Sequence, residues 1–397
     1  MNPYKGLKNI PHNVWMLAFA TLINRSGTMV IPYLAIYMNK KIGVSASDAG
    51  LVFIFYGIGS FITSMLAGKL SDRIGELKVM RYSLIGTGVL LLFYSFITNY
   101  HFILFITLVW AVISEAFRPA NLSLLSFESD PQQVKTTFSL NRLAINLGMS
   151  IGPVIGGFLS QVNYALLFYA NALTSFLAAI FLYLVKFEKR EGVDLRKSTN
   201  KNVENSFNFF SVLQDKRMLF YIIALIPVCM VFFQFIGGLP LYIVSELKYS
   251  ESTFGMLMAV NTVMIILVEV PLNSAMENWE DRKAIILGAI LAAIGFGLFG
   301  ISSAISMIII SIVIWTFGEM IFFPSSASYT AKLSPENKRG EYMGYYQMTF
   351  SFSLMFGPWF GTLLLQNYGS KILWFTCFGV GMISVLLFII MRKKYRE

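Results

Sequence analysis

The sequence predicts an all-α integral membrane protein whose twelve transmembrane helices form two six-helix bundles of parallel orientation. Three observations predict this fold class: an apolar composition, twelve apolar segments, and a repeat that relates the two halves. Of 397 residues, 56% are hydrophobic and only 13% are charged, whereas soluble domains contain about 25% charged residues. A soluble globular protein needs more charged residues than this to cover its surface, and a disordered chain contains fewer apolar residues. Most of this chain must therefore face lipid.

Apolar stretches of about 20 residues, the length that crosses a bilayer, occur twelve times. The first six run over Val14–Met38, Gly50–Leu70, Val79–Thr98, Phe102–Phe127, Phe138–Leu159 and Tyr164–Val185. A polar stretch then extends from Lys186 to Arg217. The last six run over Met218–Val244, Phe254–Met276, Ala284–Ser303, Ile305–Ala331, Tyr342–Leu365 and Ile372–Met391. We therefore expect a first bundle at residues 1–186, a linker at 187–217 and a second bundle at 218–397.

The lysines and arginines test this topology independently of hydropathy, because cytoplasmic loops carry an excess of them. Of the 31 lysines and arginines, 24 lie on one side of the predicted membrane and four on the other. The remaining three, Arg25, Arg118 and Arg142, lie inside helices. Both termini and the linker are therefore expected to be cytoplasmic, in a cell (inner) membrane. The net charge of +10 is then an orientation signal, and no nucleic-acid partner is expected. Anionic lipid or another partner for the linker is the alternative.

Several distinctive residues recur at an offset of 205 along the chain. Ser45, Ser47 and Gly50 return as Ser250, Ser252 and Gly255; Trp110 and Pro119 return as Trp315 and Pro324; Gly152, Pro153 and Gly156 return as Gly357, Pro358 and Gly361. Since each half has an even number of spans, both halves begin on the same face of the membrane. The repeats are therefore parallel, which is the symmetry of a secondary transporter built from two bundles.

The residue inventory excludes most membrane enzymes. Two cysteines and two histidines, each distant from the others in the sequence, cannot form a clustered metal or haem site. No convergent nucleophile or acid–base set is visible, and there is no glycine-rich Walker loop for an ATP-driven pump. We expect neither an enzyme nor a bound cofactor.

The loop between the second and third predicted helices reads Gly68-Lys69-Leu70-Ser71-Asp72-Arg73-Ile74-Gly75. It resembles the signature of the major facilitator superfamily, with Glu76-Leu77 where two cations are common. Gly68 permits a close helix approach, Asp72 can meet the N-terminal end of a neighbouring helix, and Arg73 can pair with a carboxylate such as Glu128. The resemblance implies a cytoplasmic gate of Gly68, Asp72, Arg73, Gly75 and Glu128; the alternative is a solvated charged turn.

The fifth predicted helix carries Gly148, Gly152, Pro153, Gly156 and Gly157. Glycines four residues apart make a smooth stripe that admits another helix, and the proline loosens the local hydrogen bonding. The pattern resembles the antiporter motif of the 12-helix drug:proton antiporter group. Tight helix packing explains it as well.

Ionisable groups inside a bilayer cost about 2.5–3.5 kcal/mol each, so they persist mainly where they face a cavity or a partner. The family resemblance implies that helices 1, 4, 7 and 10 line a central cavity. The resulting candidates for proton coupling are Glu319, Glu115 and Glu269, and those for the substrate cavity are Asn24, Arg25, Tyr33, Arg118 and Gln234. A structural ion pair between Glu115 and Arg118, and an interhelical hydrogen bond at Glu269, are the alternatives.

The resemblance spans essentially the whole chain and implies a secondary transporter that works by alternating access. Proton-coupled export of small amphipathic or drug-like compounds is our leading expectation, with the proton gradient as energy source. Proton-coupled import of a peptide, sugar or siderophore is the alternative, and a receptor or channel is a more distant one. The expected partners are a small-molecule substrate, protons and the lipid bilayer, with the protein acting as a monomer.

Overall fold

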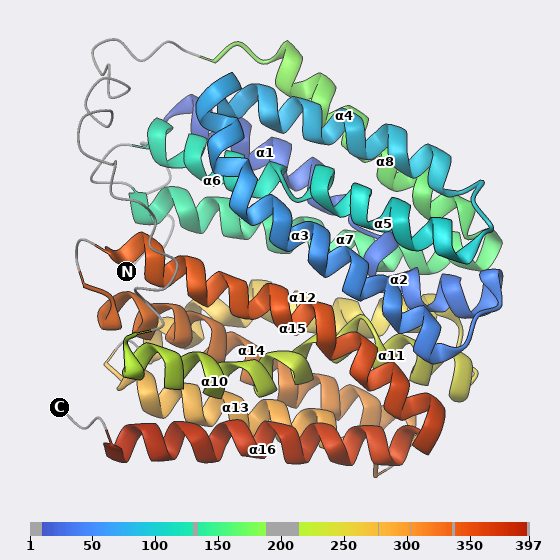
Figure 1. The fold of residues 1–397 in the computed structure, drawn as a ribbon, viewed down its shortest axis with the longest axis vertical. Helices are drawn as coiled ribbons and strands as arrows, with labels where there is room; N and C mark the ends of the chain where they lie inside the picture. Colours follow the sequence, from blue (N-terminus) through green and yellow to red (C-terminus); the bar gives the residue numbers. More distant parts are fainter. Residues whose placement is uncertain are drawn as a thin grey trace.

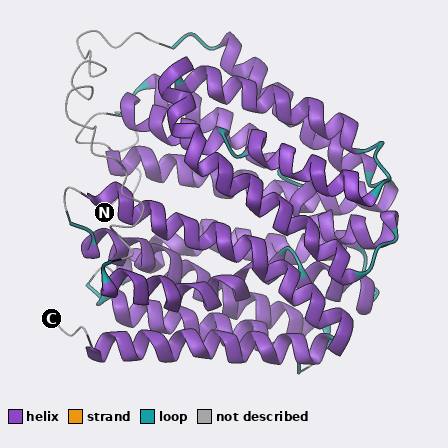
Figure 2. Ribbon diagram, in the orientation of Figure 1, coloured by secondary structure: helices purple, strands orange, loops and turns teal. Residues whose placement is uncertain are grey.

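A computed structural model describes residues 10–129, 134–187, 214–276, 278–301, 303–335 and 338–394. All regular structure in these ranges is helical (Figure 2). Most of the linker expected at residues 187–217 lies outside them.

The first half contains six spans, two of which are interrupted. Span 1 comprises α1 (His12–Ser26), α2 (Val30–Tyr37) and the π-helix η2 (Met38–Ile42); spans 2 and 3 are α3 (Ala46–Ile74) and α4 (Glu76–Tyr94); span 4 comprises α5 (Tyr100–Ser114) and α6 (Phe117–Glu128); spans 5 and 6 are α7 (Val134–Val162) and α8 (Ala165–Leu184). These elements match the predicted segments in order and type.

The second half has the same number of spans. Span 7 comprises α10 (Lys216–Phe232), η3 (Phe233–Phe235), α11 (Gly238–Pro240) and η4 (Leu241–Glu246), and spans 8 to 12 are α12 (Glu251–Ala275), α13 (Asp281–Leu298), α14 (Ile305–Leu333), α15 (Arg339–Tyr368) and α16 (Ser370–Lys394). Within the described residues, 11 of the twelve spans are long and apolar enough to cross a membrane by composition alone. The exception is α13, whose 18 residues begin with the charged triplet Asp281, Arg282 and Lys283.

The repeat seen in the sequence is present in three dimensions. α12, α13, α14, α15 and α16 each begin 205 residues after α3, α4, α5, α7 and α8 respectively. A side-chain contact repeats as well: Ser123 donates a hydrogen bond to Glu76 at 3.2 Å, and Ser328 donates one to Asp281 at 3.2 Å. The two halves are therefore structural duplicates.

Figure 1 shows the two halves as neighbouring bundles, with the start of α1 and the end of α16 at the same end of the molecule. We call this the terminal end, and the opposite end the distal end. The main contacts between the halves pair α3 with α15 and α7 with α12. By the 205-residue offset, α3 corresponds to α12 and α7 to α15, so the repeat symmetry relates the two pairings to each other.

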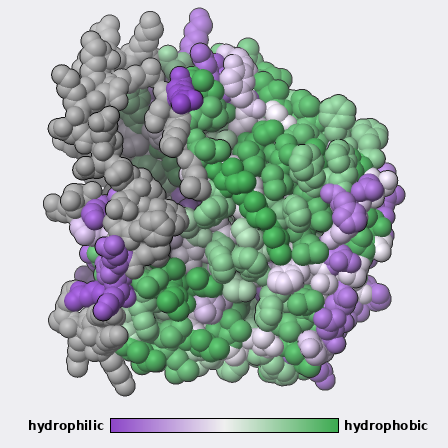
Figure 3. All heavy atoms as spheres, in the orientation of Figure 1, coloured by the Kyte–Doolittle hydropathy of each residue, from purple (hydrophilic) through white to green (hydrophobic). Residues whose placement is uncertain are grey.

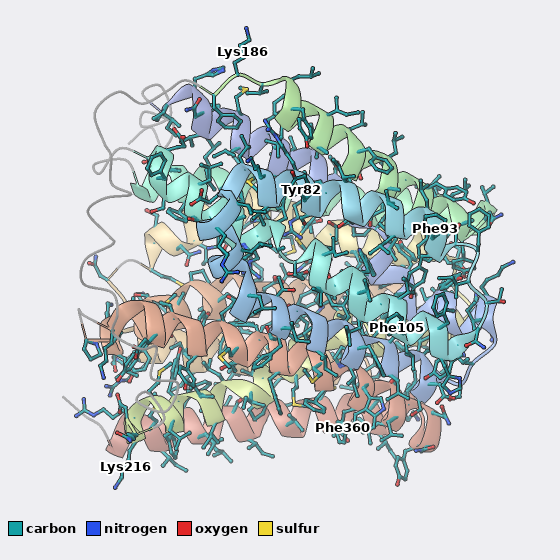
Figure 4. The ribbon with its side chains drawn as sticks, turned by 45° about the horizontal axis from the view of Figure 1, so that its top comes forward. Tyr82, Phe93, Phe105, Lys186, Lys216 and Phe360 are labelled. Carbon is teal, nitrogen blue, oxygen red and sulfur yellow. The ribbon has the colours of Figure 1, made fainter. Side chains whose placement is uncertain are left out.

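The surface is typical of a protein surrounded by lipid. Hydrophobic side chains cover the middle of the face drawn in Figure 3, and hydrophilic ones gather at its distal edge. Large aromatic side chains point outward from this belt, including Tyr82, Phe93 and Phe105, whose exposed fractions exceed one half (Figure 4). Lys186 and Lys216 lie at the terminal end, outside the belt.

In spans 1 and 4, a proline lies four residues after a residue of the gap. A proline ring clashes with the carbonyl group four residues before it and supplies no N–H to bond there. Pro32 acts in this way on Thr28, in the gap between α1 and α2, and Pro119 acts on Glu115, in the gap between α5 and α6. The predicted segment Phe102–Phe127 is confirmed as one span, Tyr100–Glu128, with a turn at Glu115 and Ala116 that separates α5 from α6.

Candidate functional site

An ion pair joins the two halves within the predicted membrane region. Arg142 of α7 donates to Oε1 of Glu269 on α12. The Glu269 side chain is only 8% exposed, whereas that of Arg142 is 50% exposed. Because a charge at this depth is costly without a partner or water, the half-exposed arginine marks a place where solvent reaches the interface between the halves.

A second carboxylate lies beside this pair. Asn261 of α12 donates through Nδ2 to Oε2 of Glu319 on α14, at 2.8 Å, and to Thr316 at 3.0 Å. Arg142 lies within electrostatic range of Glu319. Arg142 is therefore paired with Glu269 and lies in electrostatic range of Glu319, so the three groups carry a formal charge of −1 when both carboxylates are ionised.

A similar cluster of polar and ionisable side chains lies in the interior of the first half. Tyr56 of α3 donates to Oε1 of Glu115 at 2.6 Å, and Arg25 and Arg118 lie in electrostatic range of this pair. Arg118 reaches across to the second half, where its Nη2 lies 3.5 Å from Oε1 of Gln347 on α15. Asn261 is the repeat counterpart of Tyr56. In each half, therefore, the side chain at this position binds a carboxylate two spans further along the chain: Glu115 in span 4 and Glu319 in span 10.

The glycine stripe of α7 receives the interrupted first span. A methyl group at Gly148 would lie 2.6 Å from Cβ of Arg25, and one at Gly152 would lie 3.0 Å from the carbonyl oxygen of Thr28. Gly156 faces Met29 and Tyr33 in the same way. The stripe therefore fixes the position of Asn24 and Arg25 at the end of α1.

Gly157 and Pro153 face the other half of the molecule instead. A methyl group at Gly157 would lie 2.7 Å from the carbonyl oxygen of Glu251, and one at Gly255 would lie 2.6 Å from that of Pro153. The predicted motif therefore combines packing within the first half with close contact between the halves.

Two predicted cavity residues are buried in packing contacts. Tyr33 is fully buried and donates to the carbonyl oxygen of Pro153 at 2.6 Å, so it belongs to the distal contact between the halves. Gln234 is 3% exposed and donates to the carbonyl oxygen of Gly357 at 2.6 Å. Both side chains were placed in the cavity only because of their helix numbers, and the breaks in spans 1 and 7 turn them toward neighbouring helices.

The predicted gate residues are spread over three elements. Gly68 and Asp72 lie near the end of α3, and the contacts of their side chains lie outside what the structure describes. Gly75 ends α3 with a φ of +90°, a conformation that favours glycine. Glu128 is buried and accepts a hydrogen bond from Asn13 of α1 at 2.8 Å, whereas Arg73 is exposed. In the part of the chain that the structure describes, no ion pair joins Arg73 to Glu128.

The sequence interpretation left Arg142, Asn261 and Tyr56 out of the candidate site. Arg142 was recognisable as a cation within a span, and a lone charge in lipid implies a partner on another helix. Asn261 and Tyr56 carry no such signal, because their shared role appears only when the repeat is placed in three dimensions.

The sequence matches the profile of the Major Facilitator Superfamily over residues 14–250 and 235–397. The chain belongs to this family. It is thus a membrane-spanning transporter and not an enzyme, as the loop motif and the repeat predicted.

Relatives of this transporter include the Bacillus subtilis protein YqjV, an MFS-type transporter, with 25% identity over 92% of this chain and 89% of that protein. A Na⁺, Li⁺, K⁺/H⁺ antiporter of Planococcus maritimus is 21% identical over 85% and 88% of the two chains. The quinolone resistance protein NorA of Staphylococcus aureus is 27% identical over 38% of this chain and 39% of its own length.

Solved transporters share the fold at low sequence identity. The nucleoside transporter NupG superposes with a TM-score of 0.81 at 14% identity, over 96% of this chain and 100% of that one. A D-xylose–proton symporter superposes with a TM-score of 0.78 at 14% identity, over 96% and 97% of the two chains. These likenesses confirm the two-bundle fold.

Proposed function

We propose that this transporter exports small amphipathic or drug-like compounds in exchange for protons. The ion pair of Arg142 with Glu269, with Glu319 in electrostatic range of the same arginine, carries the proposal. Two carboxylates that share one arginine leave a single negative charge in a site of low polarity. Either a proton or a cationic substrate neutralises that charge, so each lowers the affinity for the other, which is the thermodynamic requirement for exchange.

The position of the ion pair links this competition to movement of the two halves. Arg142 belongs to the first half, and Glu269 and Glu319 belong to the second. Protonation of Glu269 removes its ion pair with Arg142, which links α7 to α12. Protonation of Glu319 instead leaves Glu269 as the only charged carboxylate of the two that attracts Arg142. The distribution of protons over the two carboxylates therefore favours one arrangement of the halves over another.

The rest of the architecture is assigned on the same basis. We place the moving units at residues 1–186 and 218–397, acting in a monomer of a cell (inner) membrane with both termini in the cytoplasm. The distal end, where the halves are in contact, then faces outward. Gly68, Asp72, Arg73 and Gly75 form the cytoplasmic gate, and Asn24, Arg25 and Arg118 face the substrate path. The proton gradient is the energy source, without a cofactor.

Substitution of each carboxylate by its neutral isostere tests the coupling. In proteoliposomes with an imposed pH gradient and ethidium as the cationic probe, Glu319→Gln should abolish uphill transport while probe binding persists. Glu269→Gln and Glu115→Gln are measured beside it, and Glu246→Gln, an exposed carboxylate at the distal end, is the matched control. Uphill transport by Glu319→Gln at the parent rate would transfer the coupling role to whichever other carboxylate variant loses it.

The alternative is proton-coupled import of a nutrient such as a peptide, sugar or siderophore, and the fold shared with a D-xylose–proton symporter is consistent with it. The direction of proton movement separates the two functions. In an exchanger, a substrate gradient imposed across a vesicle drives protons against the substrate flow, whereas in a symporter it drives them along with it. A pH-sensitive dye trapped inside the vesicles records the sign.

The gate assignment has its own test. Asp72→Asn should lower transport without lowering expression, because an allosteric contact of this kind is worth about 1–3 kcal/mol between conformations. A variant that transports at the parental rate would identify the loop as a solvated turn.

A further inference from the structure

The interior of the first half contains a small polar cavity. It is lined by residues of α1, α3, α4 and the α5–α6 region, among them Asn24, Arg25, Tyr56, Ser83, Trp110 and Glu115. Its volume of about 40 Å³ is room for a few atoms, because a single water needs roughly 10–15 Å³ by this measure. A drug-sized ligand needs a pocket of about 300 Å³ or more. The cavity is therefore too small to hold a whole drug-sized substrate.

Two buried donors point to what the cavity holds. The Nε of Arg25 and the Nε1 of Trp110 have no hydrogen-bond partner among the described residues, and Trp110 is only 3% exposed. Both nitrogens can only donate. A buried donor left without an acceptor costs about 1–3 kcal/mol, so a ligand that accepts hydrogen bonds would relieve two such costs together.

The surrounding charges select the type of acceptor. Among the described residues, Arg25 and Glu115 line the cavity and Arg118 lies within electrostatic range of both, while the Glu115 carboxylate is already bound by the hydroxyl of Tyr56. The group therefore carries a formal charge of +1. A bound cation would lie against the guanidinium group of Arg25, with Arg118 in electrostatic range, whereas a monovalent anion neutralises the excess charge and can accept hydrogen bonds from both unpartnered donors.

We propose that this cavity binds a small monovalent anionic group, either a free halide ion or the carboxylate of a larger ligand. The proposal concerns binding within the first half. It does not depend on the direction of transport or on the coupling role of Glu319.

The repeat supplies an internal control. Trp315, the counterpart of Trp110, also has a buried Nε1 without a partner among the described residues. It packs against Phe296, with ring centroids 5.3 Å apart, and the residue at the position of Arg25 is Met230. The second half thus presents the same indole without a cation at the position of Arg25, so Trp315→Phe removes an equivalent group where no anion is expected.

Thermal unfolding of the purified transporter in lipid nanodiscs tests the proposal. Sodium chloride is compared with sodium sulfate at equal ionic strength, because sulfate is divalent, larger than chloride and carries no carboxylate. The parent and Trp315→Phe should show a saturable rise of the midpoint with chloride. Trp110→Phe should weaken chloride affinity about tenfold, the effect of one hydrogen bond to a charged group, and Arg25→Met should abolish the response.

Crystals grown with bromide give a readout that does not depend on any variant. An anomalous peak within hydrogen-bond distance of Trp110 Nε1 and Arg25 Nε is the expected result. A parent protein that responds equally to chloride and sulfate and shows no such peak would overturn the proposal and leave the cavity to water. Equal loss of the response in Trp315→Phe and Trp110→Phe would also overturn it.

Competition distinguishes the two sources of the anionic group. Chloride affinity is measured with fluorescein, which carries a carboxylate, and with ethidium, which carries none. A fall in chloride affinity with fluorescein alone would assign the cavity to the carboxylate of a ligand, and unchanged affinity with both dyes would assign it to free halide.

Discussion

Tyr164 of the first half donates a hydrogen bond to Oε1 of Glu251 in the second half, at a distance of 2.7 Å. Lys40 donates to the same oxygen at 3.0 Å. Together with the hydrogen bond from Gln161 to Ser252 at 2.8 Å, these contacts hold the distal end closed. One carboxylate at the start of α12 therefore joins two separate segments of the first half.

Loss of the Lys40 contact should favour opening of the distal end. Lys40 is 39% exposed and Glu251 is 12% exposed, and partly exposed ion pairs are worth about 0.2–1 kcal/mol. Lys40→Met should therefore increase the distally open population by a few-fold at most. This population is measured by double electron–electron resonance between spin labels at Thr98 and Ser303. Both positions are exposed, lie in distal loops and are related by the repeat.

Lys41→Met is the matched control, because Lys41 is exposed and adjacent but makes no ion pair with a described residue. The same distance distribution in both variants would show that the Lys40 contact does not contribute to closure.

The glycine stripe should tolerate substitution only where space exists. Alanine in a helix is favoured over glycine by about 1 kcal/mol, but at Gly148 the added methyl group would lie 2.6 Å from Cβ of Arg25 and 2.8 Å from the backbone nitrogen of Ser26. Overpacking of this kind costs about 1–3 kcal/mol. Gly148→Ala should therefore lower the unfolding midpoint in detergent.

Gly379→Ala, in α16, is the control for that substitution, since nothing lies within 4 Å of the added methyl group. Its midpoint should stay level or rise. A fall of equal size in both variants would mean that backbone flexibility, and not close packing, accounts for the glycines of α7.

The orientation in the membrane follows from the charge count and is tested by labelling. Ser198→Cys, in the predicted cytoplasmic linker, should react with an impermeant thiol reagent only after cells are lysed. Asn367→Cys, exposed in the last turn of α15 at the distal end, should react in intact cells. Cys229 and Cys377 are buried and give little background, so reaction of Ser198→Cys in intact cells would reverse the assignment.

Most of the fold could be predicted because it depends on features that can be read directly from the sequence. Apolar length gives the spans, and the 205-residue offset gives the duplication that fixes which helices correspond. The site was less predictable, because it depends on where a helix breaks. Tyr33 and Gln234 carry no local signal that turns them toward α7 and α15, and only the interruptions in spans 1 and 7 do so.

Ionisable residues were the most informative single positions. Glu319 and Glu269 were selected because lipid penalises charge; Arg142 pairs with Glu269 and lies in electrostatic range of Glu319. Their partner Arg142 was visible as a lone cation, but the choice of α12 as its neighbour depends on packing between the halves. Asn261 was missed because an amide in a membrane span is common enough to give no signal.

The break in span 4 leads to a last prediction. Pro119 supplies no N–H for the carbonyl group of Glu115, and its ring clashes with that group, so α5 ends at Ser114 and α6 begins at Phe117. Pro119→Ala restores the missing bond and should join the two helices. The amides from residue 115 to 121 should then exchange hydrogen for deuterium more slowly. Pro324→Ala, the repeat counterpart, lies within the continuous helix α14 and should change exchange much less.

A continuous span 4 would also turn Glu115 away from its present position at a helix end. Its hydrogen bond from Tyr56, now 2.6 Å long, should then weaken, and the chloride response attributed to the neighbouring cavity should fall with it. Slower exchange together with an unchanged chloride response would show that the cavity does not depend on the break. Unchanged exchange would show that contacts of Glu115 and its neighbours, rather than Pro119, interrupt the helix.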